Sequence, residues 1–368
     1  MKRVLIVTEH NLTSLGGIQK VISDITTNLK SKYIFDVVTF ESMNKDEKKQ
    51  FTQYRNIFEI PCKVNQNGIN RIFEVIKRPI RIRSNLNRII KFGKYDVVHC
   101  HDIYKGGYAL QIAERNNVPI RICQSHISKA TDPKGIIKKL YFTHMQKKLK
   151  YATVNIGVSK IAGEALFGNN DYIVIRNGTD LSRFNGKKSD LRDGKIRFIH
   201  VGRYSFQKNH EFLVNVFNYI HQELPETMLT LVGWGELEEN IKTQIHNLHL
   251  DGCVKMLPAN SDVAELMSQS DYMIFPSRYE GLSLVSLEAQ AMNVMCFASD
   301  AITDEVKEIG LWKTFSLDIG EKAWAQYIID YIRNDKRKQD VLNKEILREF
   351  DIRTVVQKYE KVYEGILK

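Results

Sequence analysis

The sequence contains little proline and cysteine and no long hydrophobic run. Its 368 residues include 7 Pro and 21 Gly, which excludes collagen-like and low-complexity chains. The five cysteines form no Cys-x-x-Cys pair, so we expect free thiols in a reducing cytoplasm rather than a disulfide framework. The run Val4–Val7 is shorter than the roughly 7 apolar residues of a signal peptide core. Residues 281–298 come closest to the roughly 18 residues of a membrane span, but Glu288 and Gln290 interrupt them.

Acidic residues are scarce in the first half of the chain. Residues 1–180 hold 30 Lys and Arg against 15 Asp and Glu, whereas residues 181–368 hold 24 against 28. The excess is concentrated in 71–94, with eight basic side chains and one acid, and in 129–150, with seven Lys and one Asp. A solvated helical face would account for this pattern, but attraction to an anionic membrane surface fits best, because each Lys or Arg near such a surface contributes about 1 kcal/mol. No nucleic-acid-binding motif accompanies it, so we expect no nucleic-acid partner.

Short β-branched runs alternate with helical stretches along the whole chain. This pattern predicts two successive doubly wound parallel sheets, because strands covered on both faces are continuously apolar. The polar stretch Asn177–Lys195 separates the two series. We therefore predict an N-terminal domain over 1–176, a C-terminal domain over 177–350, and a final helix over 351–368 that packs back on the N-terminal domain. Eleven strands are predicted: Arg3–Thr8, Asp36–Phe40, Asp96–Cys100, Ile120–Gln124, Thr153–Val158, Tyr172–Ile175, Ile196–Val201, Met228–Val232, Cys253–Leu257, Tyr272–Phe275 and Val294–Ala298.

Three loops after predicted strands contain residues suited to a phosphorylated sugar. Gly16 and Gly17 open a helix after the first strand, where backbone N–H groups can approach a phosphate or simply form a turn. They form no Gly-x-Gly-x-x-Gly fingerprint, which argues against a dinucleotide dehydrogenase. In the second half, Gly202, Arg203 and Lys208 follow a strand directly, and two cations there suit a diphosphate. A solvated basic loop is the alternative interpretation.

The third loop runs from Glu280 through Gly281, Leu282 and Ser283 to Glu288. Carboxylates bind sugar hydroxyls well, and the N–H groups at a helix start can hold phosphate. The alternative is that Glu280 is only a helix-start acid and Glu288 a surface charge. The apolar neighbours of Glu288 argue against full solvation.

With these motifs in this order, the sequence resembles a family 4 retaining glycosyltransferase of the GT-B fold, from the branch that builds bacterial capsule and exopolysaccharide. The resemblance implies an α/β architecture with two Rossmann-like domains facing across a cleft. Gln19 stands where the family commonly has Glu, and Trp234 where it commonly has Asp. The motifs that carry the resemblance are Gly16–Gln19, Arg176–Asp180, Gly202–His210, Val232–Gly235, Glu280–Glu288 and Ser299–Thr303.

The resemblance also implies a role for each matching residue. Arg203 and Lys208 bind the donor diphosphate, with Gly202 beside them. Glu280 binds the donor sugar, near the backbone of Gly281, Leu282 and Ser283, and Glu288 holds the ribose. Gly16 and Gly17 approach the donor from the N-terminal domain. His126, after the strand Ile120–Gln124, corresponds to the active-site histidine near the reacting sugar, although a lone histidine after a strand is more often structural.

The expected reaction moves a hexose or N-acetylhexosamine from a nucleotide sugar, UDP in particular, to a lipid-diphosphate-linked saccharide. The resemblance implies no cofactor and no metal; His99 and His101 flank Cys100 but lack an acidic or thiolate partner at ligand spacing. We expect a cytoplasmic enzyme, peripheral on the inner face of the plasma membrane. The alternatives are a nucleotide-sugar 2-epimerase of the same architecture and a non-catalytic sugar-nucleotide-binding protein, which Gln19 mildly favours.

Overall fold

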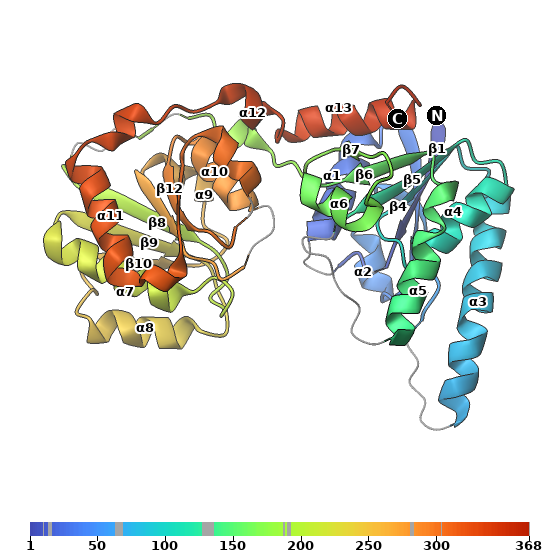
Figure 1. Ribbon diagram of the computed structural model, residues 1–368, viewed down its shortest axis with the longest axis horizontal. Helices are drawn as coiled ribbons and strands as arrows, with labels where there is room; N and C mark the ends of the chain where they lie inside the picture. Colours follow the sequence, from blue (N-terminus) through green and yellow to red (C-terminus); the bar gives the residue numbers. More distant parts are fainter. Residues whose placement is uncertain are drawn as a thin grey trace. The chain divides into compact units, whose positions relative to one another are not determined.

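The computed structural model describes most of the chain and divides it into two compact units. It describes residues 1–9, 11–13, 17–62, 69–126, 136–186, 188–189, 193–279, 283–302 and 304–367. Unit 1 comprises Met1–Asn177 and Arg353–Lys368, and unit 2 comprises Gly178–Ile352 (Figure 1). These boundaries lie one or two residues beyond the expected ones. Thr179 forms a parallel bridge with Asp351, so the first and last residues of unit 2 lie side by side.

Unit 1 is a doubly wound parallel sheet of seven strands. Its strand order is β3-β2-β1-β4-β5-β6-β7, and β1 is buried from Val4 to Val7 because helices cover both faces of the sheet. The strands are β1 (Lys2–Thr8), β2 (Tyr33–Thr39), β3 (Tyr54–Glu59), β4 (Val97–Cys100), β5 (Ile120–Ser125), β6 (Val154–Gly157) and β7 (Ile173–Val174). The helices are α1 (Gly17–Leu29), α2 (Lys45–Lys49), α3 (Ile69–Gly93), α4 (Gly106–Arg115), α5 (Ile136–Gln146), α6 (Lys160–Phe167) and α13 (Ile352–Tyr363), the last of which starts in unit 2.

Unit 2 repeats the arrangement with six strands. The order is β10-β9-β8-β11-β12-β13, and every strand pair is parallel. The strands are β8 (Ile196–Val201), β9 (Thr227–Val232), β10 (Val254–Leu257), β11 (Tyr272–Phe275), β12 (Met295–Ser299) and β13 (Trp312–Phe315). The helices are α7 (His210–Glu223), α8 (Glu238–Asn247), α9 (Val263–Ser268), α10 (Leu284–Ala291), α11 (Glu321–Arg333) and α12 (Lys344–Arg348).

The prediction of two doubly wound parallel sheets is therefore confirmed. Two strands were missed, β3 and β13, and both lie at sheet edges. Edge strands are covered less completely, so polar residues such as Arg55 and Lys313 interrupt their apolar pattern.

The C-terminal helix α13 packs on the strands of unit 1, beside the start of β1 (Figure 1). Tyr359 and Tyr363 are fully buried, and the ring of Tyr363 meets that of Tyr33 edge-on at 5.4 Å between centroids. Lys32 forms a 2.6 Å ion pair with Glu360. Among the described residues, no helix combines the length and apolar character needed to cross a bilayer.

Candidate functional site

The loop after β8 begins at a point where two backbones almost touch. Gly202 donates its N–H to the carbonyl of Val232 at 2.9 Å. A Cβ on Gly233 would lie 2.0 Å from the carbonyl oxygen of Gly202, so only glycine fits at position 233. This contact fixes the path of the loop that bears Arg203 and Lys208.

Arg203 is an exposed cation held against the loop that follows β9. Its Nε lies 3.1 Å from Glu236 Oε2, and its guanidinium carbon lies 4.9 Å from the centroid of the Trp234 ring. Trp234, one of the two departures from the family pattern, therefore provides an aromatic face for the guanidinium. The Arg203 side chain is 58% exposed, so an anionic ligand can reach it.

Lys208 lies in the same loop, which is tied to the loop after β11. The Lys208 ammonium lies 4.7 Å from the centroid of the Phe275 ring. Arg278 donates its backbone N–H to the carbonyl of Gln207 at 2.8 Å, and its guanidinium donates to Asn209 Oδ1 at 2.9 Å. These bonds bring the predicted diphosphate loop next to the segment that leads to Glu280.

Two buried histidines lie close beneath Gly202 and Lys208. His200 and His210 are both fully buried, with ring centroids 4.6 Å apart. Burial, and then the Lys208 charge, lower the pKa of His210 to about 3. The pKa of His200 is also lowered, first by burial and then by His210. Both rings are therefore neutral and add no charge to the two cations above them.

The predicted carboxylate loop is described only from Ser283 onward. Glu280, Gly281 and Leu282 lie outside the described residues. Ser283 caps α10 by accepting from the N–H of Ser286 at 3.4 Å. Glu288 is partly buried on α10 and accepts a 2.9 Å hydrogen bond from the hydroxyl of Thr179. Thr179 belongs to the motif Arg176–Asp180, so the structure joins two motifs that are far apart in sequence.

In unit 1, His126 directly follows β5, and Gly17 begins α1, whereas Gly16 lies outside the described residues. His126 is partly exposed and lies 3.1 Å from His101, measured from Nε2 to Nδ1. His101 follows β4 and is 2% exposed. Burial lowers the pKa of both rings, that of His126 to about 3.

His99 has both ring nitrogens engaged in hydrogen bonds. Nε2 lies 2.8 Å from Gln124 Oε1, and Nδ1 lies 2.9 Å from the hydroxyl of Tyr363. The imidazole therefore has no nitrogen left for a metal. Within the described ranges, no group of three or more His, Cys, Asp or Glu side chains is arranged to hold a metal ion.

A carboxylate pair lies at the same edge of unit 1, and the sequence analysis did not predict it. Asp102 accepts the backbone N–H of Lys105 at 3.1 Å, and the Lys105 ammonium lies 3.1 Å from Glu9. Burial, and then the negative charge of Glu9, raise the pKa of Asp102 to about 7. The polar run His99–Asp102 at the end of a predicted strand could have indicated Asp102 as a candidate site residue.

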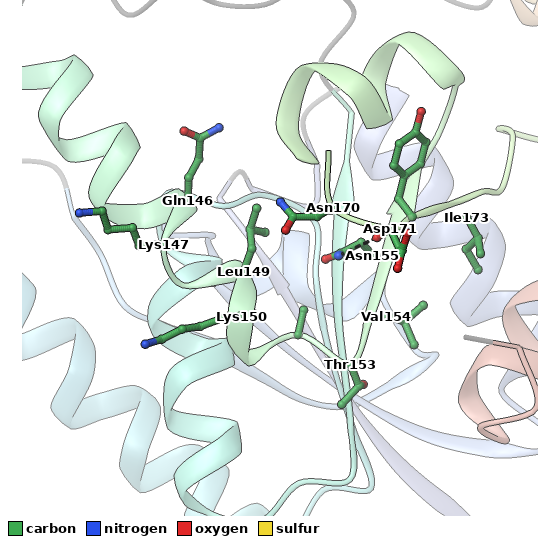
Figure 2. Close-up of a pocket in the computed structure, with 12 residues that line it drawn as sticks. Gln146, Lys147, Leu149, Lys150, Thr153, Val154, Asn155, Asn170, Asp171 and Ile173 are labelled. Carbon is green, nitrogen blue, oxygen red and sulfur yellow. Dashed lines mark hydrogen bonds between the residues drawn. The ribbon is translucent and has the colours of Figure 1, made fainter. Parts of the chain in front are cut away.

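A polar cavity of 520 Å³ lies elsewhere in unit 1. Figure 2 shows Asn155, Asn170 and Asp171 gathered in it, with the Lys147 and Lys150 side chains directed away from this group. Its walls include Thr153 and Val154, where β6 begins. Ligands of doubly wound sheets bind at the opposite, carboxyl ends of the strands, so the candidate site is not this cavity.

Two family models match this chain in succession. The model described as Glycosyltransferase Family 4 matches residues 15–183, and the model described as Glycosyl transferases group 1 matches residues 182–346. The boundary between the matches lies close to the start of unit 2.

Three curated relatives of this chain are named as glycosyltransferases. The chain is 29% identical over 356 residues to the putative glycosyltransferase EpsF of Bacillus subtilis, covering 89% of this chain and 87% of the relative. It is 25% identical to the capsular polysaccharide biosynthesis glycosyltransferase CapH of Staphylococcus aureus, with 75% and 79% covered. It is 26% identical to the UDP-Gal:α-D-GlcNAc-diphosphoundecaprenol α-1,3-galactosyltransferase of Escherichia coli, with 59% and 60% covered.

The solved structures include one with the same fold over the whole chain. Anabaena HepE in complex with UDP superposes with a TM-score of 0.74 and 16% sequence identity. The match covers 99% of this chain and 100% of HepE.

Proposed function

The chain belongs to glycosyltransferase family 4 and has the GT-B fold, and from this premise we propose that it is a retaining, metal-independent transferase. It moves a hexose or N-acetylhexosamine from a nucleotide sugar to a lipid-diphosphate-linked saccharide, in the synthesis of a capsule or exopolysaccharide. The name of CapH and the acceptor named for the Escherichia coli relative support the pathway and the acceptor class.

The observation that carries this proposal is the pair of cations at the carboxyl end of β8. Arg203 is exposed, and Lys208 lies in the same short loop, which the Gly202–Gly233 contact fixes. A guanidinium and an ammonium there bind the donor diphosphate and stabilise the charge that grows on it as the glycosidic bond breaks. The UDP complex of HepE supports UDP as the nucleotide.

The remaining residues orient the donor. Glu288 holds the ribose hydroxyls, and its bond to Thr179 fixes the carboxylate. Glu280 binds the donor sugar, together with the backbone of Gly281, Leu282 and Ser283. In unit 1, Gly16 and Gly17 approach the donor, and His126 contacts the reacting sugar.

In a retaining transfer the acceptor hydroxyl attacks the anomeric carbon on the face that the diphosphate leaves. The C–O bond to the diphosphate breaks, the bond to the acceptor oxygen forms, and a phosphate oxygen takes the acceptor proton. No separate carboxylate base is then needed, and the two cations supply the charge that a divalent ion supplies in other transferases.

The experiment that tests this proposal follows UDP release from UDP-sugars by the full-length protein, with and without a lipid-diphosphate-linked saccharide. A transferase releases UDP rapidly only with the acceptor, and the product from an α-linked donor is an α-glycoside by its NMR coupling constant. Activity persists in excess EDTA. A β-linked product, or activity that disappears in EDTA and returns with Mg²⁺, contradicts the mechanism. Conversion of the donor without acceptor identifies a 2-epimerase, and binding without turnover identifies a non-catalytic protein.

The acceptor class implies that unit 1 docks on the inner face of the plasma membrane. Helix α3 carries exposed apolar side chains, with Ile80 69% and Phe92 76% exposed. Exposed cations lie between and beside them, at Lys77, Arg88 and Lys91. This pairing of cations with exposed apolar side chains fits an anionic leaflet, because apolar groups insert shallowly while cations attract the headgroups.

Charge reversal on α3 tests this docking. Lys77, Arg88 and Lys91 are changed together to Glu, and the matched control changes Lys255, Lys322 and Lys336, which are exposed in unit 2. The α3 variant is expected to lose flotation with anionic vesicles and transfer to a lipid-linked acceptor, while keeping transfer to a soluble one. Equal flotation of both variants would contradict docking through α3.

A further inference from the structure

The ring of His126 contacts a second histidine that the proposed mechanism does not use. His126 Nε2 lies 3.1 Å from His101 Nδ1, and the two rings are stacked with centroids 5.3 Å apart. His101 is 2% exposed, whereas His126 reaches the surface of unit 1. The buried ring therefore has no direct access to a substrate and acts only through its neighbour.

Hydrogen bonds fix the ring of His99, which stacks on His101. Gln124 Nε2 donates to the hydroxyl of Tyr359 at 2.7 Å, so Gln124 Oε1 faces His99 Nε2 and accepts its N–H at 2.8 Å. His99 Nδ1 then accepts the Tyr363 hydroxyl at 2.9 Å. With its ring fixed in this way, His99 stacks on His101 at 4.2 Å between centroids. Two residues of α13 thus help to set the plane of the His101 ring.

The environment of His101 Nε2 indicates which ring nitrogen carries the proton. His101 Nε2 is buried and has no hydrogen-bond partner among the described residues. A buried N–H without an acceptor is rarer than a buried acceptor without a donor, so the proton of the neutral ring is on Nδ1. There it is donated to His126 Nε2. Because burial also keeps His126 neutral by lowering its pKa, His126 carries its own proton on Nδ1.

We infer that His101 is a positioning residue that fixes His126 in the tautomer protonated on Nδ1, so that His126 offers the substrate an N–H group instead of a basic lone pair. This inference rests on the proposed function, in which His126 contacts the reacting sugar. The ligand atom that suits this N–H is an oxygen acceptor, such as a sugar hydroxyl oxygen. His126 is then a hydrogen-bond donor in the transfer and not its general base.

Two substitutions at position 101 separate this role from simple packing. In His101→Asn the side-chain amide occupies the place of Nδ1 and can still donate to His126. In His101→Gln the amide reaches the place of Nε2, so the bond to His126 is lost although the side chain stays polar and of similar size. A merely structural role predicts that the two variants behave alike.

The test measures the tautomer of His126 by ¹⁵N NMR of the histidine-labelled full-length protein, together with the kcat of transfer. We expect the Nδ1–H tautomer in the wild type and in His101→Asn, and a mixture of tautomers in His101→Gln. The kcat of His101→Gln falls about tenfold, as expected for the loss of one hydrogen bond, with the donor KM unchanged. An unchanged tautomer in His101→Gln, or equal kcat for the two variants, overturns the inference.

A separate variant distinguishes failure of this inference from failure of the proposed function. His126→Ala with full turnover would show that His126 takes no part in transfer, which contradicts its place in the proposed function. The tautomer measurement would still decide whether His101 fixes the state of the His126 ring.

Discussion

Units 1 and 2 share a doubly wound architecture but offer different chemistry at the carboxyl edges of their sheets. In unit 2 the groups at this edge are charged and accessible, as with Arg203, whose side chain is 58% exposed. In unit 1, His99 and His101 are buried and neutral, and His126 is partly exposed. In the proposed function, exposed charge in unit 2 binds the diphosphate, whereas in unit 1 the partly exposed His126, held by buried histidines, donates a hydrogen bond to the sugar.

The same difference appears in how each edge is held in place. In unit 2, backbone bonds and the Gly202–Gly233 contact fix a short loop between two motifs of the same unit. In unit 1, the network runs from His101 through His99 and Gln124 to the C-terminal helix. The edge of unit 1 therefore depends on contacts between β4, β5 and the C-terminal helix α13.

The largest expected effect is the loss of turnover when a positive charge is removed from unit 2. Arg203→Ala and Lys208→Ala each remove a cation from the departing diphosphate, which costs about 3 kcal/mol of transition-state stabilisation, or roughly a hundredfold in turnover. Steady-state kinetics of the purified variants measures this loss. Lys255→Ala, at an exposed position on β10, is the matched control and keeps full turnover. If either variant at 203 or 208 matches the control, that residue does not bind the diphosphate.

The second-largest expected effect is the loss of stability when the Gly202–Gly233 backbone contact is disrupted. Gly233→Ala places a methyl group 2.0 Å from the Gly202 carbonyl oxygen, so the loop shifts and unit 2 loses about 2 kcal/mol of stability. Gly252→Ala is the control, because a Cβ there meets nothing within 4 Å. Denaturant unfolding and UDP titration measure both variants. Equal stability and UDP affinity would show that the contact does not position the loop.

The smallest effect concerns the neutral histidines of unit 1. Burial lowers the pKa of His99 from 6.5 to about 4. Between these values the unfolded chain binds a proton that the folded chain does not, so stability falls as pH falls through this window. From pH 6.5 to 5.5 the loss from His99 is about 1 kcal/mol. Hydrogen-exchange protection of β4 and β5, compared at the two pH values, measures this loss. Equal protection of β4 at both pH values would contradict a neutral, buried His99.

More of the candidate site in unit 2 than in unit 1 could be predicted from the sequence, and the reason is physical. Arg203 and Lys208 lie within one loop directly after a strand, where spacing alone indicates a binding edge. The bonds from Gln124 to His99 and Tyr359 join residues up to 235 positions apart. No local pattern specifies such contacts. The edge strands β3 and β13 were missed because their incomplete burial weakens the apolar periodicity.

In the proposed function, unit 2 holds the diphosphate by charge, while unit 1 acts on the sugar through hydrogen bonds. Calorimetric titration of UDP into the wild type, Arg203→Ala and His126→Ala tests this most directly. The account predicts that UDP binding weakens about tenfold in Arg203→Ala, or about 1.4 kcal/mol, and is unchanged in His126→Ala. Unchanged affinity in Arg203→Ala, or weakened affinity in His126→Ala, would contradict it.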